Sequence, residues 1–216
     1  MRLFLLLSIL FLTSCGTTYK IADIQDKQKV EKEFLNPYFS QINKEYSYRF
    51  KITFMKNEMK GNFVVKKLGY DSHRVVMMSD FGNTLFDLSI SENNYNLNYA
   101  MPDLNKKVVV KTLANDLQML FKNDFKVDES IKTANFVVLK SKEVSLVFDE
   151  NESSYFQELI HLKNNKIKTF NCFTTNQTDY PEKILIKHYH FNLSIELSKV
   201  NTQLEEDLTN LNYNIF

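Results

Sequence analysis

Glycine, proline, cysteine and tryptophan are scarce in this chain. Its 216 residues include 4 glycines, 3 prolines, 2 cysteines and no tryptophan. With so few glycines and prolines, the tight turns must be built mainly from Asn, Asp and Ser, whose side chains bond to the backbone of a turn. Cysteine is too rare for a disulfide framework, so a stable fold needs a hydrophobic core.

A strong charge of either sign is also absent. The sequence holds 27 basic and 26 acidic residues, which gives a net charge of +1. Proteins that bind nucleic acid concentrate positive charge. The balance of charges therefore argues against a nucleic-acid partner.

Recognisable catalytic motifs are missing as well. The sequence contains no glycine-rich phosphate loop, no G-x-S-x-G and no Cys–His pair of the kind that nucleophilic enzymes use. Acidic pairs such as Asp149 and Glu150 fall in charged turns or tails, where solvation explains them. We therefore expect a protein that is not an enzyme and that needs no cofactor.

The histidines offer one candidate metal site. His188 and His190 are two residues apart, a spacing that would put both side chains on one face of a strand as possible zinc ligands. They fall, however, at a predicted hairpin turn, and no third ligand is near. Solvent-exposed turn residues are the better interpretation, and no metal site is predicted.

The strongest signal lies at the N-terminus. An apolar run from Leu3 to Leu12 leads into Ser14, Cys15 and Gly16. The run is too short for a membrane-spanning helix, which needs about 20 residues, but it fits a secretory signal. Small residues before a cysteine resemble the bacterial lipobox, which would make residues 1–14 a signal peptide and Cys15 a lipidated N-terminus. The alternative is an ordinary signal peptide with a chance cysteine.

The lipobox resemblance has further implications. Acyl chains would tether the protein to a membrane without spanning it, since several chains together hold a protein firmly. Gly16, rather than Asp, follows the cysteine, which resembles lipoproteins that are sent to the outer membrane and face the periplasm. Cys172 would be left unpaired, and we expect it to be buried as a small apolar side chain.

Most of the chain alternates between apolar and polar residues. The clearest case covers residues 46–54, and residues 84–90 and 95–99 repeat the pattern. A period of two is typical of strands with one buried and one solvated face. About eleven such strands are predicted between residues 46 and 200.

Two segments break this pattern. Residues 105–122 place Val109, Leu113 and Leu117 at a spacing that predicts an amphipathic helix. Residues 21–33 are charged, and their thinly spaced apolar residues predict a helix with a narrow docking face. The predicted fold is mainly β with helices (α+β), in which about eleven antiparallel strands form a curved, unclosed β-barrel covered by helices.

One predicted turn carries an apolar residue that a turn does not need. Residues 79–83 read S-D-F-G-N and join a short strand at 74–78 to the strand at 84–90. Asp, Gly and Asn are ordinary turn residues, whereas Phe81 is not. Because loop tips face solvent, its ring is either folded back onto the sheet or kept outside for a partner.

This turn and its two strands resemble the outer-membrane lipoprotein-insertion factor LolB and the wider LolA/LolB-like group of periplasmic lipid-binding lipoproteins. That family has P-L-G, then S or N, then T in the turn, where residues 80–84 here read D-F-G-N-T. The apolar residue before the glycine is kept in kind, and the proline is not. The order of elements over residues 46–200 and the Tyr180–Pro181 start of the final hairpin also resemble the family.

The resemblance implies a division of the chain and a function. Residues 15–45 would form the lipidated N-terminus, tether and N-terminal helix, residues 46–200 the half-barrel domain, and residues 201–216 a C-terminal tail. The protein would be a monomer that faces the periplasm and is anchored in the outer membrane through Cys15. It would accept acylated lipoprotein cargo from a LolA-like periplasmic carrier and insert it into that membrane.

The expected site residues form two sets. Phe81 and Gly82 would form a loop that engages the membrane or the cargo during release. An apolar cavity for acyl chains would be lined by side chains of the predicted strands: Phe50, Ile52, Phe63, Val65, Met78, Phe86, Leu88, Leu97 and Leu146. Two alternatives remain open: a barrel filled by its own side chains, and a lipid-binding or scaffold lipoprotein of the outer membrane with no transfer role.

Overall fold

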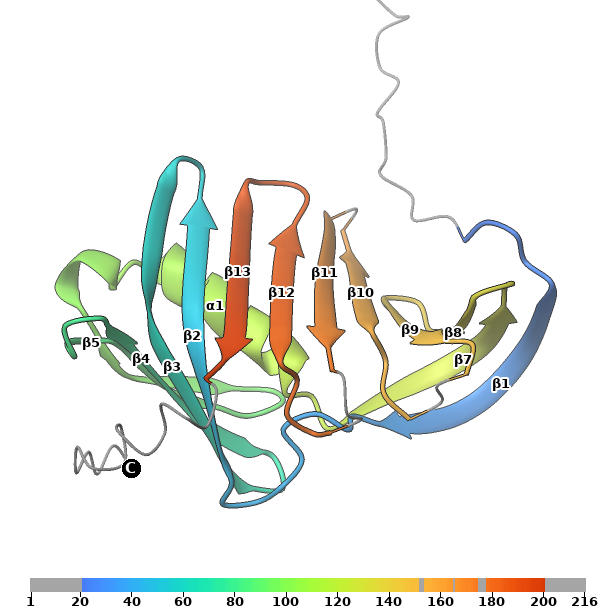
Figure 1. Ribbon diagram of the computed structural model, residues 1–216, viewed down its shortest axis with the longest axis horizontal. Helices are drawn as coiled ribbons and strands as arrows, with labels where there is room; N and C mark the ends of the chain where they lie inside the picture. Colours follow the sequence, from blue (N-terminus) through green and yellow to red (C-terminus); the bar gives the residue numbers. More distant parts are fainter. Residues whose placement is uncertain (1–20, 152–153, 165, 175–177, 201–216) are drawn as a thin grey trace, which may run out of the picture.

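The computed structural model describes residues 21–151, 154–164, 166–174 and 178–200, and in them the chain folds as one curved antiparallel sheet with a helix against its inner face (Figure 1). The strands of the first half are β1 (Asp26–Leu35), β2 (Glu45–Phe54), β3 (Asn57–Gly69), β4 (Ser72–Ser79), β5 (Thr84–Ile90) and β6 (Tyr95–Ala100). The helices η1 (Pro102–Leu104) and α1 (Lys107–Leu120) follow. The second half contains β7 (Asp124–Lys132), β8 (Phe136–Lys140), β9 (Val144–Asp149), β10 (Glu158–Lys163), β11 (Lys166–Phe173), β12 (Lys183–His188) and β13 (Leu193–Lys199).

The two halves of the chain meet in the middle of the sheet. From edge to edge the order is β1-β7-β8-β9-β10-β11-β12-β13-β2-β3-β4-β5-β6. The junction is the pairing of β13 with β2, which sets Ile195 opposite Ile52 and Leu197 opposite Phe50. β1 and β6 form the two edges, and the sheet does not close into a barrel.

The main core lies on the inner face of this curve. Every second residue of the central strands points inward, so that Tyr46, Tyr48 and Phe50 of β2 are at most 2% exposed. α1 crosses behind β2, β13 and β12 in the view of Figure 1 and packs Leu113 and Leu117 into the same core. None of the described helices is long and apolar enough to cross a membrane.

Aromatic side chains fill one end of the curved sheet. The segment between β1 and β2 carries Phe39, whose ring packs edge-on at 5.0 Å from the rings of both Tyr46 and Phe121. Next to it, the Tyr38 hydroxyl donates a hydrogen bond of 2.6 Å to the carbonyl of Phe156. This end is therefore packed with side chains, and any free space must lie toward the other end.

The predicted fold class is wrong in its helices and in its number of strands. The described residues form 13 strands, whereas about eleven were predicted. In the described part of the chain α1 is the one α-helix, and it does not cover the sheet as the predicted helices would.

The segment predicted to form an N-terminal helix is strand β1. Its charged residues favour a helix in isolation, but here its backbone pairs with β7, from Asp26 opposite Lys132 to Leu35 opposite Asp124. Val30 and Phe34 pack against the core, while the charged side chains face solvent. A charged strand at a sheet edge also discourages pairing with another chain.

Candidate functional site

A cavity of about 1290 Å³ lies between α1 and the inner face of the sheet. From the helix it is lined by Val109, Thr112 and Met119, which share one face of the helix. From the sheet it is lined by Ile52 of β2 and Phe86 of β5, among others. Its volume exceeds the range of about 300–1,000 Å³ that is typical of small-ligand pockets.

The walls of this cavity are mostly apolar. Phenylalanine and methionine side chains are prominent among them, and such side chains adapt well to irregular apolar ligands. The apolar lining consists of Ile52, Phe54, Met59, Phe86, Leu104, Val108, Val109, Leu113, Met119, Phe191, Leu193 and Ile195. These walls suit a hydrocarbon chain.

The cavity reaches the end of the sheet that the aromatic side chains leave free. Its lining includes Phe54 and Asn57 at the β2–β3 hairpin, Lys166 at the β10–β11 hairpin, and His190 and Phe191 at the β12–β13 hairpin. Neighbouring antiparallel strands place these three hairpins at the same end of the sheet. We call it the hairpin end.

A buried charged cluster joins α1 to the sheet at the wall of the cavity. The carboxylate of Asp116 accepts a hydrogen bond from Lys168 Nζ at 2.8 Å and one from His188 Nε2 at 2.8 Å. The side chains of Asp116 and His188 are completely buried. Because a carboxylate can only accept, Nε2 of His188 carries a proton.

The strand register continues this cluster across the sheet. His161 of β10 lies opposite Lys168 of β11, which in turn lies opposite His188 of β12. On the same face and two residues nearer the hairpin end, Lys163 lies opposite Lys166. These residues all line the cavity, so its polar part lies near the hairpin end beside β10, β11 and β12.

The polar part of the cavity disfavours a positive charge on His161 and His190. Burial lowers the pKa of His161, and the charge of Lys168 lowers it further. The pKa of His190 is likewise lowered, first by partial burial and then by His188, Lys166 and Lys168. Both rings therefore lie where an additional positive charge is disfavoured.

The interpretation of His188 as a solvent-exposed turn residue is wrong. His188 ends strand β12 and is 3% exposed, whereas His190 is exposed at the hairpin. Its partner Asp116 is 72 residues away, so local spacing gave no sign of the contact. The one available signal was an acidic residue within the apolar stripe of α1. Over residues 21–200, gaps excepted, no group of three or more His, Cys, Asp or Glu side chains could hold a metal ion.

Phe81 projects from the turn between β4 and β5 and is 92% exposed. The turn is closed by hydrogen bonds from Gly82 N to the Ser79 carbonyl at 3.0 Å and from Ser79 N to the Asn83 carbonyl at 2.9 Å. Gly82 has φ = 81°, a conformation that side chains disfavour. The ring of Phe81 is thus held outside the fold, in the second of the two arrangements that the sequence leaves open.

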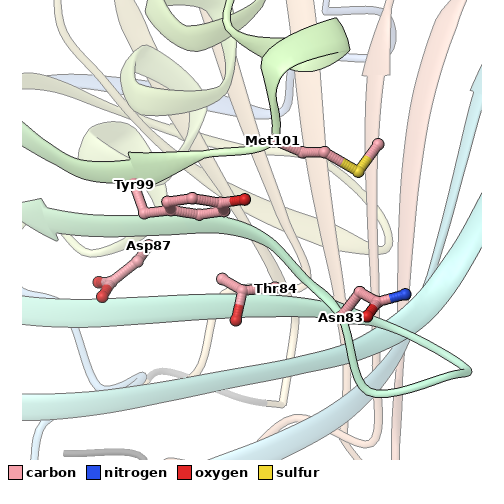
Figure 2. A pocket seen from close by; sticks show the side chains of 5 residues that line it. All are labelled: Asn83, Thr84, Asp87, Tyr99 and Met101. Atoms are coloured by element: carbon pink, nitrogen blue, oxygen red, sulfur yellow. The ribbon is translucent and has the colours of Figure 1, made fainter.

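A second hollow of about 480 Å³ lies beside the Phe81 turn. Figure 2 shows its lining, with Tyr99 and Met101 on one side and Asn83, Thr84 and Asp87 on the other. This hollow has a mixed polar and apolar lining and lies near the β6 edge of the sheet, so we assign no ligand to it.

The side chains predicted to line a cavity occupy different places. Ile52 and Phe86 line the cavity beside α1. Phe50, Phe63, Val65, Leu88 and Leu146 are buried in the main core, and Met78 and Leu97 are partly buried. The core on the inner face is thus packed over much of its area, and the free space is concentrated beside α1.

Of the two cysteines, Cys172 lies in the described part of the chain and Cys15 does not. Cys15, the predicted lipidation site, and the predicted signal peptide and C-terminal tail lie outside the described residues. Cys172 is buried in β11, as expected, and burial raises the pKa of its thiol.

Comparison with known proteins finds a structural relative but no sequence relative. No family model and no curated protein matches the chain. A crystal structure from Vibrio parahaemolyticus, described as an outer membrane lipoprotein-sorting protein domain, matches 76% of this chain and 86% of its own with a TM-score of 0.39 and 7% sequence identity. The similarity is coarse, and the proposals below rest on this chain's own residues.

Proposed function

We propose that the protein is an outer-membrane-anchored lipoprotein that receives acylated lipoproteins from a LolA-like periplasmic carrier and inserts them into the outer membrane. The acyl chains are held in the cavity beside α1, and the protein itself is a monomer tethered through Cys15. The proposal rests above all on one observation, the cavity of about 1290 Å³ with mostly apolar walls.

The energetics of such a transfer need no catalysis and no cofactor. Removing a hydrocarbon chain from water stabilises it by about 0.8 kcal/mol for each methylene group. A cavity wall and a bilayer offer comparable apolar surroundings, so a chain can pass between them when their affinities differ only modestly. What the protein must supply is an apolar path that water does not interrupt.

The hairpin end has features that fit contact with a bilayer. Phe54 and Met55 are exposed at the β2–β3 hairpin, Tyr189 at the β12–β13 hairpin and Phe81 at the β4–β5 turn. Exposed apolar groups gathered at one end often mark membrane or protein contacts. Because the cavity reaches the same end, a chain that left it would emerge close to the bilayer surface.

A transfer assay tests the proposal. A periplasmic carrier loaded with a fluorescent lipoprotein is mixed with liposomes that contain the protein, and the fluorescence recovered with the liposomes is measured. The proposal predicts recovery that requires the protein. Acyl binding without any transfer would instead favour the alternative, a lipid-binding or scaffold lipoprotein with no transfer role.

A further inference from the structure

His188 has one unused polar atom at the wall of the cavity. Its Nε2 is bonded to Asp116, whereas Nδ1 is buried and has no hydrogen-bond partner among residues 21–200 as far as they are described. A buried polar atom without a partner costs free energy and calls for an explanation. Since His188 lines the cavity, a bound ligand can supply the missing partner.

The surroundings of this atom are rich in donors that an anion would bind. Lys163, Lys166 and Lys168 line the same part of the cavity and outnumber the carboxylates of Asp116 and Glu143. Asp116 is already bonded to Lys168 and His188, and Glu143 lies 3.9 Å from Lys163. The described residues give Lys166 no carboxylate partner, so its ammonium group remains available.

The polar and apolar parts of the cavity are arranged in rows. The row His161–Lys168–His188 crosses β10, β11 and β12 near the hairpin end. The same row continues across β13 and β2 with Leu193 and Phe54, which line the cavity with apolar side chains. A ligand that satisfies both parts of the row has a charged head and a hydrocarbon chain.

From this geometry we propose that the cavity contains a headgroup site for anionic amphiphiles, in which Lys166 binds a carboxylate or phosphate while the hydrocarbon chain lies against the apolar walls. The inference rests on the proposed function, because it assumes that the cavity holds acyl chains. Nδ1 of His188, whose Nε2 proton is donated to Asp116, accepts from a hydroxyl of the head. Asp116 and Lys168 hold the ring in place.

The site defines a ligand class that the acyl cavity alone does not. The acylated end of a lipoprotein carries esters and an amide, which are uncharged. A fatty acid or a lysophospholipid has the same kind of chain with an oxyanion at its end. The headgroup site therefore predicts that anionic lipids bind more tightly than neutral lipids of equal chain length.

Photo-crosslinking tests this preference on the full-length protein in phosphatidylcholine liposomes. Three photoactivatable probes share one palmitoyl chain and differ in the head: free palmitate, lysophosphatidate and neutral monoglyceride. Labelling of peptides from α1 and β2 is measured by mass spectrometry as a function of probe concentration. We expect half-maximal labelling by an anionic probe at a concentration about tenfold lower than by the neutral probe, as a charge-assisted hydrogen bond would give.

Matched variants locate the preference. Lys166→Gln should bring the anionic probes to the level of the neutral probe. Lys187→Gln, in which the altered residue is next to His188 but on the opposite face of β12, should keep the preference. His188→Gln should weaken labelling by lysophosphatidate and monoglyceride, whose heads carry a hydroxyl, and a thermal melt establishes whether that buried variant folds. If the His188→Gln variant does not fold, the effect of Lys166→Gln on the anionic preference decides whether the headgroup site exists.

The outcomes separate this inference from the function on which it rests. A preference for phosphate alone points to phospholipids and for carboxylate alone to free fatty acids, and both support the site. Equal labelling by all three probes, or a preference that survives Lys166→Gln, overturns the headgroup site and leaves the acyl cavity intact. Absence of labelling in α1 and β2 by every probe contradicts the proposed function itself.

Discussion

The carboxylate of Asp116 lies 2.8 Å from Nε2 of His188, although 72 residues separate the two in the sequence. The first residue belongs to α1 and the second to β12, and both side chains are completely buried. The contact fixes the helix against the sheet beside the cavity. The same two residues thus set both the position of α1 and the polar character of the cavity wall.

Removing this carboxylate should destabilise the fold. Asp116→Ala leaves His188 buried without its partner and Lys168 without its ion pair, so we expect the free energy of unfolding to fall by about 3 kcal/mol. Urea denaturation measures the change. Asp103→Ala removes an exposed acidic residue from η1 and should alter stability by less than about 0.5 kcal/mol. Equal effects of the two substitutions would show that the buried cluster is not structural.

Gly61 is a point of close approach inside the sheet. A Cβ atom at this position would lie 2.0 Å from the carbonyl oxygen of Met78 and 2.8 Å from Cε1 of Phe50. Gly61→Ala should therefore force the backbone of β3 and β4 apart and cost about 1–3 kcal/mol in urea denaturation. Gly69→Ala is the matched control, because its Cβ would meet nothing nearer than Ser72 Cβ at 4.0 Å. A fully stable Gly61→Ala variant would contradict the close contact.

Phe81 should matter for transfer and not for folding. Its side chain is 92% exposed, so Phe81→Glu should change the free energy of unfolding by less than about 0.5 kcal/mol. A charge at that position cannot enter a bilayer, and we expect the rate of lipoprotein transfer to liposomes to fall at least about tenfold, the factor that 1.4 kcal/mol gives. Acyl binding should persist.

Tyr70 provides the control for the Phe81 substitution. It is an exposed aromatic residue, 72% accessible, in the β3–β4 turn at the opposite end of β4. Tyr70→Glu should leave transfer unchanged because that turn does not face the membrane in the proposed orientation. Loss of transfer in both variants, or in neither, would remove the specific role of the Phe81 turn.

His73 should make the fold less stable at acidic pH. Burial lowers its pKa from 6.5 to about 4, against the opposing effect of its contact with the Phe39 carbonyl. Between these values the unfolded chain binds a proton that the folded protein does not. The free energy of unfolding should thus fall by roughly 3 kcal/mol as the pH drops from 7 to 4.

A substitution isolates this contribution from the other titrating groups. The ring of His73 stacks on Phe121 at 4.7 Å between centroids, so His73→Gln lowers stability at every pH. The informative quantity is the slope. The variant should lose roughly 3 kcal/mol less than the original protein over the same pH range, and parallel curves would argue that His73 does not titrate with a lowered pKa.

The sequence predicted the central strands and α1 well, for a simple physical reason. Over residues 46–54 one face is buried and the other solvated, so alternation reports the strand directly. The helix at Lys107–Leu120 has its own apolar stripe, which buries Leu113, Leu117 and Leu120. Where a segment's own side chains decide its structure, the local pattern was sufficient.

β1 and β7 were harder to predict because the partner strand decides their structure. Residues 26–35 are charged enough to favour a helix, and pairing with β7 overrides that preference. β7 places Phe125 and Val127 in the main core, but Ile131 belongs to a second buried cluster with Val138 of β8 and Ile160 of β10, so one alternation does not run the length of the strand. An edge strand and the neighbour with which it pairs leave little trace in either sequence alone.

The roles given to the predicted site residues stay predictions, and the structure shows only where those residues lie. Residues 79–83 showed that the ring of Phe81 is either folded onto the sheet or exposed, and in the structure the ring is exposed. The cavity could not be located, because most of the side chains expected to line it pack against one another in the core instead. The Asp116–His188 contact depends on strand order and on the position of α1, neither of which any local spacing contains.

The most direct test of the account is whether the cavity holds an acyl chain. The chain from Gly16 onward, which keeps every described residue, is titrated with a fluorescent acyl probe, and an acylated lipoprotein peptide is added as competitor. We predict saturable binding of about one probe per chain that the peptide displaces. Met119→Trp, which fills the cavity from α1, should weaken binding about tenfold (a loss of 1.4 kcal/mol), whereas Leu185→Trp, on the outer face of β12, should not. A folded protein that binds no probe would contradict the central claim and would indicate a barrel filled by its own side chains.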